Sequence, residues 1–170
     1  MKNILRVLII LAATVTVVAC GNDELDFRSV LHIETGEVLS LGDPVERFNE
    51  VLGEPWIEER NGMTLYRYDQ ITVNIHDGKA VGIMEFGGFM DMDNIFRFSD
   101  VSFETTEAEL KEYFTLREFG TSGTMYTRSY DVRGNVVIAD EDTVYFVQVT
   151  VHPTTRELDT IMIGRVPPVE

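Results

Sequence analysis

The pattern of hydrophobic and polar residues along the chain predicts short β-strands separated by tight turns. Ile71, Val73 and Ile75 alternate with polar residues, and a period of two is typical of a strand that buries one face. The dipeptide Asp77-Gly78 follows and predicts a hairpin turn into a returning strand. By the same criteria, we expect strands over residues 29–35, 63–68, 71–76, 80–86, 96–103, 125–132, 136–139, 143–152 and 158–166.

A short amphipathic helix is predicted ahead of this hairpin. Asp43 is expected to cap its start, with Pro44 at the first helical position and Glu46 completing a capping box. Gly53 and Pro55 predict its end, because glycine favours helix termination and proline cannot continue a helix. The helix is expected to bury one apolar face, formed by Val45, Phe48, Val51 and Leu52.

A second helix is predicted over residues 107–114, where Thr106 is the expected cap and Glu109 completes a capping box. Each predicted helix is followed by a run of strands, so the same order of elements occurs twice. An isolated helix of this length is marginal in water and needs a sheet to pack on. The sequence therefore predicts an α+β fold of two tandem repeats, over residues 29–90 and 91–170, in which short helices pack on an antiparallel β-sheet.

Residues 1–19 differ from the rest of the chain and have the features of a secretory signal peptide. Lys2 and Arg6 form a basic start, residues 7–18 are uncharged and mostly apolar, and small residues precede Cys20. The apolar run is shorter than the ~20 residues that a transmembrane helix needs. We therefore expect residues 1–19 to be a signal peptide, and residues 20–28 to form a tether that begins at Cys20.

The segment Val17-Val18-Ala19-Cys20 resembles the lipobox of bacterial lipoprotein precursors at all of its positions. The resemblance implies a diacylglycerol on the Cys20 sulfur and cleavage after Ala19. It also implies an extracytoplasmic protein that is anchored by lipid to the outer leaflet of the cell membrane or to an outer membrane. Two or more acyl chains hold a protein on a membrane where one chain alone does not. The alternative is an ordinary signal peptide, or an uncleaved anchor, with an incidental cysteine.

The first predicted helix carries a second resemblance. It is bounded by Leu41-Gly42-Asp43-Pro44 and by Leu52-Gly53-Glu54-Pro55, and it is similar to the start of BamE/SmpA-type lipoproteins and of β-lactamase inhibitor protein repeats. The similarity covers residues 41–87, and residues 100–166 only by the order of elements. Phe114-Thr115-Leu116-Arg117 replaces the second boundary motif in the second half. The resemblance implies a binding scaffold rather than a reaction.

Composition narrows the classes of function. The chain has 170 residues and a formal net charge of −15, which excludes nucleic acid as a partner because phosphates require a basic surface. Cys20 is the single cysteine, which excludes an intramolecular disulfide and a cysteine-based zinc site. Asp91 and Asp93 are spaced as at the start of a calcium loop, but Ile95 and Phe96 break that pattern. With no recognised catalytic motif in the sequence, we expect a non-enzymatic protein with no catalytic residues, no metal and no cofactor.

The candidate functional site is one face of the predicted sheet. We expect Met63 and Leu65 to face the first helix, and strand alternation then places the tyrosines of the same strand on the opposite face. Tyrosine and tryptophan are favoured as anchors of protein interfaces. The partner-binding residues predicted for this face are Trp56, Tyr66, Tyr68, Asn74, His76, Tyr126, Arg128 and Tyr130. The alternative is that Trp56 fills a corner between helix and sheet, and that the tyrosines cover a seam between the repeats.

These observations predict a membrane-anchored extracytoplasmic lipoprotein that acts as a protein-binding module of the cell envelope. Its expected partners are the membrane, through the lipid on Cys20, and an envelope protein. One alternative is an inhibitor or immunity-type protein that neutralises a basic hydrolase, because the excess of acidic residues would steer a basic partner. Another is a small-ligand carrier, or an enzyme, that uses a cleft between the repeats.

Overall fold

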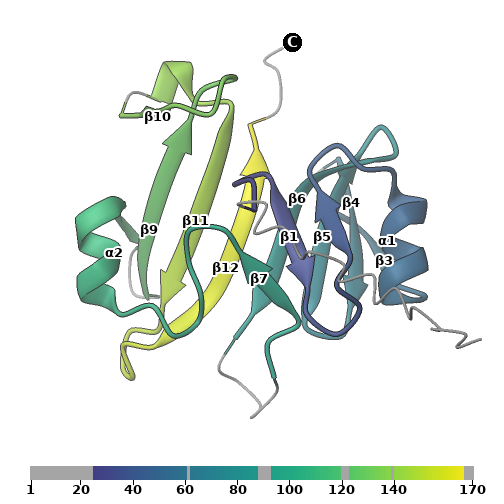
Figure 1. Ribbon diagram of the computed structural model, residues 1–170, viewed down its shortest axis with the longest axis horizontal. Helices are drawn as coiled ribbons and strands as arrows, with labels where there is room; N and C mark the ends of the chain where they lie inside the picture. The colour runs from purple at the N-terminus through teal and green to yellow at the C-terminus, as the bar shows by residue number, and fades with distance from the viewer. Residues whose placement is uncertain (1–24, 61, 88–92, 120–122, 139, 167–170) are drawn as a thin grey trace, which may run out of the picture.

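The computed structural model describes residues 25–60, 62–87, 93–119, 123–138 and 140–166 (Figure 1). The predicted signal peptide, Cys20 and the first part of the tether lie outside the described residues, as do Asp91 and Met92. In the part of the chain that is described, no helix is long and apolar enough to cross a membrane.

Nine strands of the described chain form one large antiparallel sheet. Its strands are β3 (Trp56–Arg60), β4 (Met63–Tyr68), β5 (Ile71–His76), β6 (Lys79–Phe86), β8 (Thr115–Phe119), β9 (Gly123–Tyr130), β10 (Val136–Val137), β11 (Tyr145–Val151) and β12 (Leu158–Arg165). Their spatial order is β10-β9-β11-β12-β6-β5-β4-β3, with β8 also paired to β9. The strands from β3 to β6 therefore form one half of the sheet, and the later strands form the other half.

One face of this sheet is covered by two helices and a small second sheet. The helices α1 (Val45–Leu52) and α2 (Glu107–Tyr113) lie toward the two ends of the large sheet. Between them, the small sheet crosses the centre (Figure 1), with the strand order β2-β1-β7. Its strands are β1 (Ser29–His32), β2 (Val38–Ser40) and β7 (Phe96–Phe98), and a 3-10 turn, η1 (Asp140–Asp142), completes the described elements.

The hydrophobic core lies between the large sheet and this cover. Each covering element contributes a side chain with no exposed surface: Phe48 from α1, Leu110 from α2, and Val30 and Leu39 from the small sheet. These side chains pack against a continuous apolar layer on the large sheet. The fully buried aliphatic residues of that layer are Ile71, Val73, Ile83, Val147, Val149, Val151, Ile161 and Ile163.

The predicted α+β fold of two tandem helix-on-sheet repeats is wrong. The protein is mostly β, because its helices have only 8 and 7 residues while strands make up about half of the described chain. The two halves do not have separate sheets either, since β12 pairs with β6 from Thr160–Phe86 to Gly164–Gly82. An unpaired last strand in each half would expose a row of backbone N–H and C=O groups. Pairing the two last strands removes both edges and produces one continuous sheet.

The predicted ends of the two helices are confirmed in part. Thr106 caps α2 and forms the predicted capping box with Glu109, and Gly53 ends α1 with a φ of 89°. Asp43 does not cap α1, because Pro44 is the N-cap residue there. The carboxylate of Asp43 instead accepts a hydrogen bond of 2.7 Å from the backbone N–H of Ser40. It therefore closes the turn that leads from β2 into the helix.

Three strands were not predicted, namely β2, β3 and β8. The segment Trp56–Arg60 follows the first helix directly and forms an edge strand on β4. It contains consecutive charged residues rather than alternating apolar ones, because an edge strand beyond the cover buries little surface. The predicted turn at Asp77-Gly78 is confirmed, since both residues have positive φ values, 49° and 72°.

A buried carboxylate ties the small sheet to the centre of the large one. Glu85 of β6 has no exposed surface. Its side chain accepts hydrogen bonds from the backbone N–H groups of Ile95, at 2.5 Å, and Phe96, at 3.2 Å. Burial disfavours the charged form and raises the pKa of Glu85 to about 7, although these two donors act in the opposite direction.

The raised pKa of Glu85 predicts that its contribution to stability falls as the pH rises. The pKa in the folded protein, about 7, lies above the ordinary value of 4.5, so between these values the folded state binds more protons than the unfolded state. The stabilisation is complete below the lower value and is lost as the pH rises toward 7. We predict that Glu85→Gln, which cannot ionise, removes this pH dependence. The free energy of unfolding of the variant, relative to the wild type, should rise by about 3 kcal/mol between pH 4.5 and pH 8. Urea denaturation of both proteins across this pH range measures the difference. A difference in the free energy of unfolding that stays constant with pH would contradict the prediction.

Candidate functional site

The face of the large sheet opposite the helices carries a continuous set of residues whose side chains range from exposed, as at Trp56, to buried, as at Leu65, Thr72 and Thr127. Paired residues of antiparallel strands point to the same side, so these side chains form rows across the strands. The middle row runs through Trp56, Arg67, Thr72, Met84, Met162, Gln148, Thr127 and Thr115. One flanking row runs through Glu58, Leu65, Asn74, Gly82, Gly164, Phe146 and Ser129. The pair Arg60 and Met63 follows on the same side, two residues further along β3 and β4. The other flanking row consists of Phe86, Thr160, Thr150, Met125 and Arg117. These rows are called the open face below.

The centre of the open face is shaped by two paired glycines. Gly82 of β6 lies opposite Gly164 of β12. A Cβ atom on Gly164 would lie 2.3 Å from the Phe146 ring, and one on Gly82 would lie 2.9 Å from the Cε of Met162. The absence of side chains at both positions lets Phe146 and Met162 lie against the backbone of the central strands.

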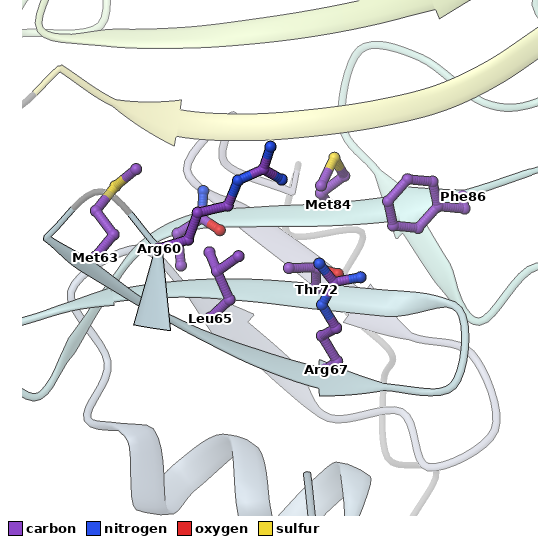
Figure 2. A pocket seen from close by; sticks show the side chains of 8 residues that line it. Arg60, Met63, Leu65, Arg67, Thr72, Met84 and Phe86 are labelled. Atoms are coloured by element: carbon purple, nitrogen blue, oxygen red, sulfur yellow. The ribbon is translucent and has the colours of Figure 1, made fainter. Parts of the chain in front are cut away.

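Two hollows lie on the open face, one on each half of the sheet. The first has a volume of about 350 Å³ and is lined by side chains of β3, β4, β5 and β6 (Figure 2). The second has a volume of about 270 Å³ and is formed mainly by β8, β9 and β11. The first hollow is lined by Arg60, Met63, Leu65, Arg67, Thr72, Asn74, Met84 and Phe86. The second is lined by Arg117, Met125, Thr127, Ser129, Thr143, Phe146, Gln148 and Val166.

Methionine is concentrated on the open face. The methionines within the described residues are Met63, Met84, Met125 and Met162, and all of them belong to its rows. Methionine side chains are flexible and polarisable, and they are common at surfaces that adapt their shape to a bound partner. Met84 and Met162 are direct neighbours across the β6–β12 pair, so the adaptable part of the face includes its centre.

The charged side chains of the open face are mostly cationic. They are Arg60, Arg67 and Arg117, with Glu58 as the one carboxylate of its rows. Arg67 forms an ion pair of 2.7 Å with Glu58, and its guanidinium lies 5.5 Å from the centre of the Trp56 ring. Arg60 forms no ion pair with any described residue. The first hollow therefore has a net positive charge, although the chain as a whole has a net charge of −15.

Trp56, Asn74 and His76 of the predicted site lie on the side opposite the helices. Trp56 is 66% exposed and begins the middle row, so it does not fill a corner between helix and sheet. Asn74 lines the first hollow. His76 is exposed at the end of β5, next to Asp77. The structure thus places these three residues on the predicted side of the sheet.

The face predicted for the other five residues, Tyr66, Tyr68, Tyr126, Arg128 and Tyr130, is wrong. They lie on the covered side of the sheet, where Tyr126 and Tyr130 are 0% and 3% exposed. The hydroxyl of Tyr68 donates to Asn49 of α1 at 2.7 Å, and that of Tyr126 donates to Glu107 of α2 at 2.6 Å. Tyr68, Tyr126 and Tyr130 therefore belong to the hydrophobic core, whereas Tyr66 packs against it and Arg128 stays partly exposed at its rim.

The buried tyrosines are satisfied because each hydroxyl has a polar partner at the rim of the core. Tyr130 donates to Asp100, which also forms an ion pair of 3.6 Å with Arg128. Burial raises the pKa of Tyr68 to about 12, and burial together with the Glu107 carboxylate raises the pKa of Tyr126 to about 12. These phenols stay protonated and act as hydrogen-bond donors that position the helices.

The methionines and phenylalanines of the open face were not predicted as site residues. One signal in the sequence was sufficient to find Met63 and Leu65. The strands β4 and β5 are joined by the two residues Asp69 and Gln70, so Tyr68 pairs with Ile71 and shares its face. Because Ile71 faces the core, Tyr68 must do so too. The residues of β4 that alternate with it, Met63, Leu65 and Arg67, then face the opposite side.

Comparison with known proteins adds little to this picture. No protein-family model matches the chain, and no curated protein matches it. The fold is similar to part of the crystal structure of a cysteine-rich secretory protein from Staphylococcus aureus, with a TM-score of 0.45 and 13% sequence identity. The match covers 74% of this chain and 44% of that protein. A likeness at this level supports no argument about function.

The two faces of the sheet should respond differently to truncation of an aromatic side chain. We predict that Tyr126→Ala lowers the free energy of unfolding by about 3–5 kcal/mol, because it leaves a cavity under α2. Trp56→Ala should change it by about 1 kcal/mol or less, because most of this side chain is already in solvent. Chemical denaturation of both variants measures the difference. Equal losses would contradict the assignment of the two faces.

Proposed function

We propose that the protein is a membrane-anchored extracytoplasmic lipoprotein that acts as a non-enzymatic protein-binding module of the cell envelope, with the open face as its binding surface. The observation that carries this proposal is the set of exposed and partly exposed methionine and phenylalanine side chains on the side of the large sheet opposite the helices. An extended apolar surface of this kind is typical of an interaction site. The hydrogen-bonded sheet gives this surface a fixed backbone, and the flexible methionine side chains let it adapt to the shape of a partner.

The resemblance of residues 17–20 to a lipobox supports the lipid anchor. An anchored protein is confined to the membrane surface, which raises its effective concentration near other envelope proteins. The proposed partner is therefore a protein of the same compartment. Its contact with the open face would supply the cover that the helices and the small sheet supply on the other side.

The arginines of the open face do not favour the alternative of an inhibitor that neutralises a basic hydrolase. A basic partner would meet Arg60 and Arg67 at the first hollow, and charges of the same sign oppose association. The acidic residues that would attract it lie elsewhere, for example at Glu46 and Glu50 on α1 and at Glu109 and Glu112 on α2. The small-ligand carrier is also less well supported, because both hollows are formed by side chains of a single sheet face.

The lipid anchor is tested by Cys20→Ala in the full chain. We predict that the wild-type protein incorporates labelled palmitate and enters the detergent phase of a Triton X-114 extract. The variant should take up no label and remain in the aqueous phase or unprocessed, because no other residue offers a thiol. Labelling of the variant would contradict lipidation at Cys20.

The binding surface is tested by the double variant Met84→Ser/Phe86→Ser, which changes two side chains of the first hollow. Tyr113→Ser is the matched control, because Tyr113 is an aromatic side chain that is 58% exposed on α2, away from the open face. We predict that proteins cross-linked to the wild type in envelopes are lost from the double variant and kept by the control. Circular dichroism checks that all three proteins are folded. Retention by the double variant would place the interface elsewhere.

A further inference from the structure

We propose that the partner segment bound at the open face is acidic and apolar, with a carboxylate that occupies the first hollow beside Arg60. This inference rests on the proposed function, because it specifies the chemistry of the partner for the same surface. It begins with the distribution of charge. The chain has 29 acidic and 14 basic residues, yet the rows of the open face contain three arginines and one glutamate.

The first hollow contains more cationic than anionic groups. Its lining includes Arg60 and Arg67, and Glu58 pairs with Arg67 at 2.7 Å. The Nε–H of Arg67 is buried and has no acceptor among the described residues. Arg60 has no ion-pair partner in the described chain, so one guanidinium charge of the hollow is left without a counter-charge.

The other residues that line the first hollow indicate which groups of a partner can lie next to an anion there. Thr72 is 4% exposed and lines the hollow together with Asn74, so both add hydrogen-bonding groups. The walls are apolar and consist of Met63, Leu65, Met84 and Phe86. In Figure 2 the guanidinium of Arg60 lies above the sheet on the side of Met84. A carboxylate with apolar neighbours in its sequence matches both the charge and the walls.

A carboxylate also suits the geometry of guanidinium recognition. Arginine presents its N–H groups in a planar fork that binds a carboxylate through two hydrogen bonds. Such bonds are stronger where apolar side chains exclude water. A lysine or arginine of a partner would add a third positive charge to the hollow, so the site selects against basic segments.

The test uses the full chain in detergent, immobilised and exposed to a random twelve-residue peptide display library. Binders to the wild type should be enriched in Asp and Glu next to apolar residues. Arg60→Glu should bind the same peptides at least tenfold more weakly and should select basic peptides instead. Arg60→Lys is the conservative variant and should keep most of the affinity. Glu58→Gln, which removes the counter-charge of Arg67, should bind the acidic peptides as tightly as the wild type or more tightly.

The outcomes separate this inference from the proposed function. Selected peptides that lose affinity on Met84→Ser/Phe86→Ser, but are basic or insensitive to Arg60→Glu, would overturn the acidic partner and leave the binding face in place. Peptides insensitive to both changes, or no enriched peptides, would overturn both. Vesicles containing phosphatidylglycerol serve as a second probe. Binding to vesicles that depends on Arg60, without peptide binding, would identify a lipid surface as the occupant and overturn a protein partner.

Discussion

The pairing of β6 with β12 joins the two halves of the protein, and the remaining architecture depends on it. Across this pair, Met84 lies opposite Met162, Ile83 opposite Ile163, and Gly82 opposite Gly164. The isoleucines face the core, whereas the methionines and glycines face the open side. The same ladder therefore fixes the centre of both faces. Glu85, in the same strand as Met84, accepts hydrogen bonds from the backbone at the start of β7 and holds the small sheet over this centre.

A sheet of this width has two faces, and the described chain covers only one of them. Two short helices and the three-stranded sheet fill the covered face, where the tyrosine hydroxyls of β4 and β9 bind polar groups of the helices. Tyrosine suits these positions because its ring adds apolar area while its hydroxyl reaches a partner at the rim. On the opposite face Met63 and Phe86 are exposed, and the other methionine and phenylalanine side chains are partly exposed. An apolar surface that the fold itself does not cover is the physical basis for proposing a partner.

Much of the local structure was predictable from the sequence, whereas the global arrangement was not. Period-two alternation identified β5, and the Asp77-Gly78 turn and the Thr106 capping box were read correctly, because these signals are local. The β6–β12 pair joins segments that are distant in the sequence, and no local signal reveals it. For strand β4, the prediction exchanged the two faces of the sheet, because it assigned apolar Leu65 to the core and Tyr68 to the surface. The structure places Tyr68 in the core, where Asn49 satisfies its hydroxyl, and Leu65 on the opposite side of the sheet, where it is still only 8% exposed. A one-position error in strand phase exchanges every side chain between the faces.

If a partner in the cell envelope covers the open face, its methionines must be shielded there. Hydroxyl-radical footprinting of methionine measures this shielding, because all methionines of the described chain lie on that face. In the purified protein, Met63, Met84, Met125 and Met162 should all be oxidised. In intact envelopes, Met84, Met125 and Met162 should be protected several-fold, while exposed Tyr113 on α2 reacts equally in both samples. Equal oxidation of the methionines in both samples would contradict the account.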